Sequence, residues 1–166
     1  MVENYEFTDQ QTMSPPPWKY LIDACSIISQ KSGDANPRTV HASMWRKIEE
    51  FVEEKIIVTC SEVKLEVKDE ELEGWIGQHE CVVIEIDNDI QKNVIKIVNE
   101  HPDLIDFSNG KSSTDAFIIA TAMKYNLEII TEENKDSPKK IPQICKSYGI
   151  PCFKITELAE EESWSF

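Results

Sequence analysis

The sequence predicts an α/β protein in which helices cover both faces of a parallel β-sheet. Short apolar segments typical of buried strands alternate with segments of helical spacing almost throughout the chain. This alternation is typical of parallel sheets, whose crossover connections are helices. The 166 residues suit one domain, are long enough to bury a substantial core, and contain no internal repeat.

The elements follow from apolar runs and their spacing. Strands are expected where short apolar runs lie between polar or turn-forming residues, at 18–25, 56–59, 81–86, 127–131 and 151–154. Helices are expected where apolar residues recur at helical spacing, at 26–30, 41–55, 70–78, 88–99, 114–125 and 141–148. Ser61 is expected to cap a further helix, Thr156 to begin the last one, and Gly149 to end the helix before it.

Polar segments divide the chain further. Residues 1–17 end in three prolines and are expected to form a flexible arm, followed by the domain at 18–160 and a tail at 161–166. Loops are expected at 31–38 and 104–111, where glycine, proline and asparagine gather.

Charge and cysteine content exclude several classes of protein. The chain has 17 Lys and Arg against 31 Asp and Glu, a net charge of −14. This argues against broad, non-specific phosphate binding, but not against a nucleic-acid enzyme that uses bound cations. Five scattered cysteines without a C-x-x-C pair disfavour disulfide scaffolds and zinc fingers. No apolar run approaches the length of a membrane span and no leader pattern opens the chain, so we expect a cytoplasmic protein.

Carboxylates follow three of the expected strands. Asp23 lies at the end of the first, Glu62 and Glu66 follow the second one helical turn apart, and Glu132 and Glu133 follow the fourth. Ligands of open parallel sheets bind beyond the carboxyl ends of the strands. We therefore expect these side chains to meet at one rim.

A cluster of acids without basic partners is best explained by a hard cation. Asp115, in the first turn of the helix 114–125, adds a further carboxylate. Mg²⁺ and Mn²⁺ prefer carboxylate oxygens and water, whereas unpaired carboxylates repel one another. Structural interpretations stay open: Asp23 can cap the following helix, Glu66 can lie on a solvated face, and Asp115 fits a capping box with Ser112.

Four segments together resemble the PIN-domain nucleases. They are Y-L-I-D-A-C-S-I-I (20–28), S-E-V-K-L-E-V (61–67), T-D-A-F-I-I-A-T-A (114–122) and I-I-T-E-E (129–133), the third being the most specific. T-E-E followed by K-I-P-Q-I-C (140–145) is similar to a poorly characterised PIN-like subgroup of bacteria and archaea. The resemblance covers residues 18–160 and implies a PIN-like three-layer α/β/α sandwich with a central parallel sheet.

The resemblance also implies an activity and its residues. PIN-like relatives hydrolyse RNA phosphodiester bonds as metal-dependent endoribonucleases, and many are toxins of toxin–antitoxin pairs. The family's acids match Asp23, Glu66 and Asp115, and Glu133 stands where relatives often carry a fourth acid, usually Asp. These four are the expected catalytic and metal-binding residues, with Mg²⁺ or Mn²⁺ as cofactor. RNA is the expected substrate, and an antitoxin and a second copy of the chain are the expected partners.

Some positions depart from the family pattern. Cys25 stands where many relatives carry a small polar residue, so Ser26 is a candidate for the missing hydroxyl. Lys111 and Lys135 are candidates to guide the RNA backbone, and Glu62 or Glu132 can replace its neighbouring acid in the site.

One rival interpretation stays open beside the nuclease, and a second one is disfavoured by the sequence. A non-catalytic PIN-like interaction or regulatory module with a degraded site is favoured by the acidic charge. A phosphate-binding loop is disfavoured, because Gly110-Lys111-Ser112 lacks the earlier glycine that the motif requires at Ile105. Trp45 and Trp75 are expected in the core rather than as stacking platforms for bases.

Overall fold

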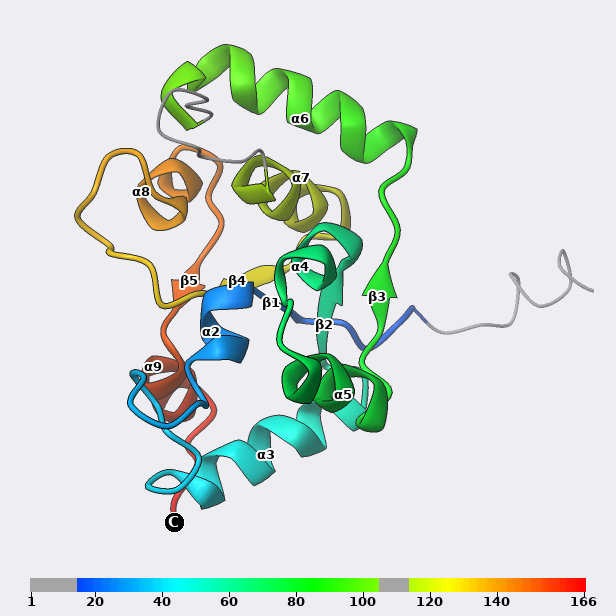
Figure 1. Cartoon of the computed structure of the whole chain (residues 1–166). Helices are drawn as coiled ribbons and strands as arrows, with labels where there is room; N and C mark the ends of the chain where they lie inside the picture. Colours follow the sequence, from blue (N-terminus) through cyan, green and yellow to red (C-terminus); the bar gives the residue numbers. More distant parts are fainter. Residues whose placement is uncertain (1–14, 105–113) are drawn as a thin grey trace, which may run out of the picture.

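The computed structural model describes residues 15–104 and 114–166 (Figure 1). Within these residues the strands form one parallel sheet in the order β3-β2-β1-β4-β5. The strands are β1 (Tyr20–Ile22), β2 (Ile57–Cys60), β3 (Val83–Ile84), β4 (Glu128–Ile130) and β5 (Cys152–Phe153). The parallel sheet expected from the alternating pattern is therefore confirmed.

Helices form a layer on each side of this sheet. Figure 1 shows α6, α7 and α8 on one side, α3, α5 and α9 on the other, and α2 and α4 near the centre. The helices are α2 (Ala24–Ile28), α3 (Ala42–Glu53), α4 (Ser61–Glu66), α5 (Glu70–Gln78), α6 (Asn88–Glu100), the 3₁₀ turn η1 (Pro102–Leu104), α7 (Thr114–Tyr125), α8 (Ile141–Lys146) and α9 (Ile155–Glu161). None of the described helices has the length and apolar character needed to cross a bilayer.

Element boundaries depart from expectation where a helix follows a strand directly. The strand expected at 18–25 is shorter, because the Asp23 side chain accepts a hydrogen bond from Ala24 N at 2.7 Å and caps α2. Cys25 consequently lies in a helix. The expectation that Ser61 caps a helix is wrong: Cys60 is the N-cap of α4, without a side-chain bond, and Ser61 is the first helical residue.

The C-terminal third shows smaller corrections. The helix expected to run to 148 ends at Lys146, and Gly149 adopts a left-handed φ of +68° just beyond it. The last helix begins at Ile155 rather than Thr156. The expected capping box of Asp115, most of the loop 104–111 and residues 1–14 of the arm lie outside the described residues.

The core is apolar and centred on the sheet. Tyr20, Leu21 and Ile22 of β1 are all fully buried, as expected for a strand with a neighbour on each side. Trp45 and Trp75 are also buried and meet edge-on, with ring centroids 6.1 Å apart, so the expectation that they belong to the core is confirmed.

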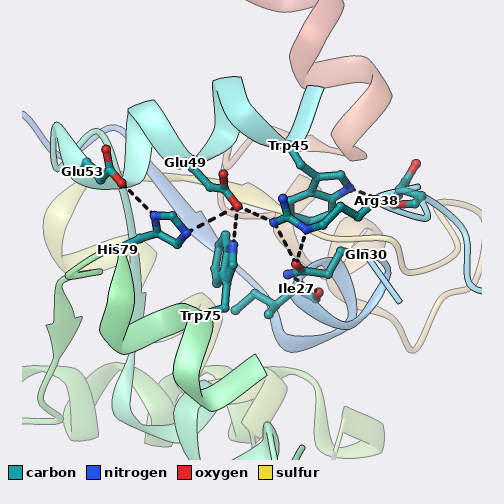
Figure 2. A network of polar contacts seen from close by, with 9 residues as sticks. Ile27, Gln30, Arg38, Trp45, Glu49, Glu53, Trp75 and His79 are labelled. Atoms are coloured by element: carbon teal, nitrogen blue, oxygen red, sulfur yellow. Dashed lines mark hydrogen bonds and ion pairs between the residues drawn. The ribbon is translucent and has the colours of Figure 1, made fainter. Parts of the chain in front are cut away.

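A polar network next to α2 joins α3 to α5 (Figure 2). Glu49 Oε2 accepts hydrogen bonds from Arg38 and from Trp75 Nε1, the latter at 2.7 Å. The same oxygen lies 3.5 Å from His79 Nε2. Arg38 Nη2 also donates to Gln30 Oε1 at 3.0 Å, just beyond the end of α2. The network therefore supports the short helix α2, which Asp23 caps.

We expect Glu49→Gln to lower the free energy of unfolding by about 2 kcal/mol, because the partly buried Arg38 guanidinium loses its carboxylate partner. Urea unfolding monitored by circular dichroism measures the change. Glu50→Gln on the same helix removes an exposed i,i+3 pair with Lys47 and should change stability by less than about 0.5 kcal/mol. Equal effects of the two substitutions would contradict the structural role of the network.

Candidate functional site

The sheet order brings three strand ends to one edge. β1 lies between β2 and β4, and all three are parallel, so the residues that follow them emerge side by side. Asp23 follows β1, α4 follows β2, and the Glu132-Glu133 pair follows β4 shortly after its end. Helix α4 also contacts both α2 and α7. The acids predicted from the sequence therefore come from elements that meet at this edge.

Asp23 is buried and fixed by three donors. Its side chain is 3% exposed. Oδ1 accepts from Ala24 N at 2.7 Å, and Oδ2 accepts from Thr131 Oγ1 at 2.9 Å and from Cys25 Sγ at 3.1 Å. No described Lys, Arg or His forms an ion pair with this carboxylate. Asp23 is thus both the helix cap and the central carboxylate of the edge.

Burial raises the pKa of Asp23 from 3.8 to about 6. The negative charge of Glu133 raises this pKa as well, whereas the hydrogen bonds from Cys25, Thr131 and Ala24 lower it. A bound cation would relieve both the desolvation of this carboxylate and its repulsion by Glu133.

Cys25 and Thr131 join Asp23 to the segment after β4. Thr131 Oγ1 accepts from Glu133 N at 3.2 Å, and Cys25 Sγ accepts from Glu132 N at 3.2 Å. The sulfur and the hydroxyl oxygen lie 3.3 Å apart. Each side chain therefore donates to Asp23 and accepts from the backbone of one of the two glutamates.

Sequence reasoning missed the role of Thr131. Its hydroxyl meets Asp23, whereas Ser26 Oγ is buried and has no hydrogen-bond partner among the described residues. The sequence feature that could have indicated this role is the threonine of the T-E-E segment, at position 131. Cys25, noted as a departure from the family pattern, proves to be the second side-chain donor to the carboxylate.

The two glutamates after β4 have different surroundings. Glu132 Oε2 accepts from Ile155 N at 2.9 Å and so satisfies the start of α9. Glu133 Oε1 accepts from Ile141 N at 3.0 Å at the start of α8. Glu133 is the one whose charge acts on Asp23, and this favours it over Glu132 as the fourth acid.

Asp115 belongs to the same electrostatic neighbourhood. It is half-buried in the first turn of α7. The pKa of Cys145 is raised mainly by its hydrogen bond with Cys152 and by burial, and further by the negative charges of Glu133 and Asp115. The two acids therefore act on one common thiol.

Glu66 and Glu62 occupy opposite ends of α4. Glu66 is the exposed last residue of that helix. Glu62 is half-buried in its first turn, and its charge joins that of Asp23 in raising the pKa of Cys60 to about 11, a shift caused mainly by burial. Glu62 and Asp23 therefore both act on Cys60, whereas Glu66 lies at the exposed end of α4, the helix that packs on α7.

The oxygen atoms of these acids suit a hard cation chemically, but the described side chains are not already arranged around a metal site. Their oxygens are the ligands that Mg²⁺ and Mn²⁺ prefer, and Asp23 has no cationic partner among the described residues. Within residues 15–104 and 114–166, however, no group of three or more His, Cys, Asp or Glu side chains is arranged to hold a metal ion. Lys135 pairs with Glu157 at 2.6 Å, and Lys111 lies outside the described residues.

Comparisons with known proteins agree with this fold. The family model for "Domain of unknown function (DUF4411)" matches residues 20–166. No curated protein matches the chain.

Solved structures supply the fold comparison. The chain is similar to VapBC2 from Rickettsia felis, solved with a DNA fragment from its promoter, at 14% identity over 81% of this chain and 97% of that chain, with a TM-score of 0.51. It is also similar to a toxin–antitoxin complex from Klebsiella pneumoniae (21% identity, 75% and 94% covered, TM-score 0.47). A third structure is FitAcB from Neisseria gonorrhoeae (14% identity, 82% and 98% covered, TM-score 0.49). The fold is PIN-like, as the four sequence segments implied.

The raised pKa of Asp23 predicts how stability depends on pH without metal. The folded state binds this proton more tightly than the unfolded state, so stability should fall by roughly 2–3 kcal/mol as pH rises from 4 to 7. Asp23→Asn should remove this fall and be more stable than the wild type at pH 7.5 in a chelator. Urea unfolding across that pH range measures the difference.

Asp103→Asn, an exposed acid on η1, is the matched control and should keep the wild-type pH profile. Parallel profiles for wild type and Asp23→Asn would contradict a buried carboxylate with a raised pKa.

Proposed function

The chain belongs to the family described as "Domain of unknown function (DUF4411)", and for this member we propose metal-dependent hydrolysis of RNA phosphodiester bonds. The observation that carries the proposal is the buried carboxylate of Asp23, held at the edge of a PIN-like sheet beside Glu133 and without a cationic partner in the described chain. Burying an unpaired carboxylate is unfavourable, and such groups concentrate at functional sites.

In this proposal Asp23, Glu66, Asp115 and Glu133 hold Mg²⁺ or Mn²⁺. A divalent ion bound there would make water a better nucleophile and neutralise charge on the phosphoryl oxygens. The chain's own residues supply orientation: Thr131 and Cys25 fix Oδ2 of Asp23, and Glu133 is anchored through Ile141 N. Burial of Asp23 excludes most bulk water from the carboxylate.

A toxin role and its partners extend the proposal. The similar structure from Klebsiella pneumoniae is named as a toxin–antitoxin complex, which supports an antitoxin partner for this chain as well. A net charge of −14 means that RNA must approach against repulsion, so activity should require millimolar divalent cation. A second copy of the chain as partner and a cytoplasmic location both stay predictions from the sequence.

A non-catalytic interaction module is the second candidate. It is favoured by the absence of a preformed three-ligand group in the described residues and by the hydrogen bonds of Glu132 and Glu133 to helix starts. In that case the acids would be structural and surface groups, and Asp23 would serve only as the cap of α2.

Titration with Mn²⁺ followed by an RNA cleavage assay separates the two candidates. For the nuclease we expect Mn²⁺ to raise the melting temperature and to support cleavage of single-stranded RNA. Asp23→Asn should reduce cleavage at least a hundredfold, a loss on the order of that caused by disrupting a metal site. Asp103→Asn should retain activity. An unchanged melting temperature together with no cleavage would favour the interaction module, and undiminished cleavage by Asp23→Asn would remove the mechanism.

The two glutamates after β4 give a matched comparison. Glu133→Gln keeps an amide oxygen for Ile141 N but loses the charge beside Asp23, so we expect weaker stabilisation by Mn²⁺ and about tenfold or greater loss of cleavage. Glu132→Gln keeps an acceptor for Ile155 N and should leave both nearly unchanged. The thermal shift with Mn²⁺ and the cleavage rate are measured for both variants. A larger loss in Glu132→Gln than in Glu133→Gln would make Glu132 the fourth acid of the site.

A further inference from the structure

The K-I-P-Q-I-C segment ends at a cysteine that the proposed nuclease does not use. Cys145 lies on α8 and Cys152 begins β5, and both are free thiols. The chain doubles back between them, because the carbonyl oxygen of Cys145 accepts hydrogen bonds from Tyr148 N at 3.0 Å and Ile150 N at 3.1 Å. Figure 1 shows the chain turning directly from α8 into β5. The turn returns the second cysteine to the neighbourhood of the first.

The two thiols interact and are not equivalent. Their side chains share a hydrogen bond, and the Cys152 thiol also donates to Ile150 O at 3.9 Å, while Ile150 N donates to the carbonyl oxygen of Cys145. Cys145 is fully buried, whereas Cys152 is half-buried at the end of the sheet. An oxidant from solvent therefore reaches Cys152 first, with Cys145 directly behind it.

The pKa directions of the two thiols also favour Cys152 as the first to react with an oxidant. The hydrogen bond with Cys145 lowers the pKa of Cys152, and the positive charge of Lys135 lowers it further, whereas burial and the negative charges of Glu133 and Asp23 oppose this shift. The same hydrogen bond, together with burial, raises the pKa of Cys145. Burial raises the pKa of the other three thiols, Cys25, Cys60 and Cys81. Because the thiolate is the reactive form, Cys152 is the thiol of this chain best placed to attack an oxidant.

We propose that Cys145 and Cys152 are an oxidisable dithiol, which a hydroperoxide converts to a disulfide that ties α8 to β5. Cys152 thiolate attacks the peroxide, the O–O bond breaks, and the alcohol (water from hydrogen peroxide) leaves with a proton. The resulting sulfenic acid on Cys152 is attacked by Cys145, which gives up its proton as the S–S bond forms and the S–O bond breaks with loss of water. The two sulfurs together lose two electrons, and the peroxide gains them.

The disulfide would act on the edge that carries the acids. Helix α8 starts at Ile141, whose N–H binds Glu133, and contains Cys145 near its other end. A covalent bond from that end to β5 would restrain the helix. It would thereby also restrain Glu133, whose carboxylate accepts the hydrogen bond from Ile141 N. The proposal itself concerns only the two thiols and holds whether or not the site is a nuclease.

Thiol counting and peptide mapping after peroxide treatment of the whole protein test the proposal. One equivalent of hydrogen peroxide should lower the free thiols from the five of the sequence to three, and a reductant should restore them. Digestion under non-reducing conditions should yield a peptide pair linked through Cys145 and Cys152. A different pairing, a link between two chains, or five remaining thiols would overturn the proposal.

Single substitutions test the order of the two steps. Cys145→Ser should leave a sulfenic acid on Cys152 that dimedone traps, because the resolving thiol is gone. Cys152→Ser should slow consumption of peroxide about tenfold or more, and Cys81→Ser, a buried control, should form the disulfide at the wild-type rate. Circular dichroism establishes that each variant is folded, and the wild-type peptide map decides the pairing even where a variant fails to fold. Dimedone labelling on Cys145 of the Cys152→Ser variant at the wild-type rate would overturn the assigned order.

Discussion

The candidate site is organised around a carboxylate buried at the end of the central strand. β1 is paired on both sides and fully buried, so the residue that follows it emerges from the interior of the sheet. Asp23 occupies that position and is 3% exposed. Removing a carboxylate from water is unfavourable, and here three hydrogen bonds offset part of the penalty without abolishing it, as its raised pKa shows. In the proposed nuclease, a bound cation would offset the remaining cost of burying this carboxylate.

The hydrogen bonds of Asp23 also explain how distant segments are held together. Cys25 is its near neighbour in the chain, whereas Thr131 is 108 residues away. Both use their acceptor capacity on backbone N–H groups of the two glutamates after β4. The segment that leads to α8 is thereby anchored to the start of α2. The contacts that cap helices also orient the carboxylates, so in the proposed nuclease the same residues would have structural and functional roles.

Support for this edge comes from both helical layers. On one side the Arg38–Glu49–Trp75 network holds the loop after α2 against α3 and α5. On the other, α8 and β5 are joined by a tight turn and by the contact between Cys145 and Cys152. Among the described residues, Lys135 is already paired with Glu157. If the proposed nuclease activity holds, divalent ions rather than this lysine would neutralise the phosphate of the substrate.

The sequence by itself determined the parallel α/β architecture, the place of Asp23 at a strand end, and the bounds of α5 and α7, which coincide with the expected ranges. These features depend on the local spacing of apolar residues, so they can be predicted from the sequence. Strand lengths and helix starts were harder to predict, since a side chain such as Asp23 can end a strand by capping the next helix. Only the tertiary structure decided that Thr131 rather than Ser26 meets Asp23, that Glu133 rather than Glu132 acts on it, and that Cys145 meets Cys152. These contacts depend on the order of the strands and the path of each turn, which no neighbouring residue in the sequence specifies.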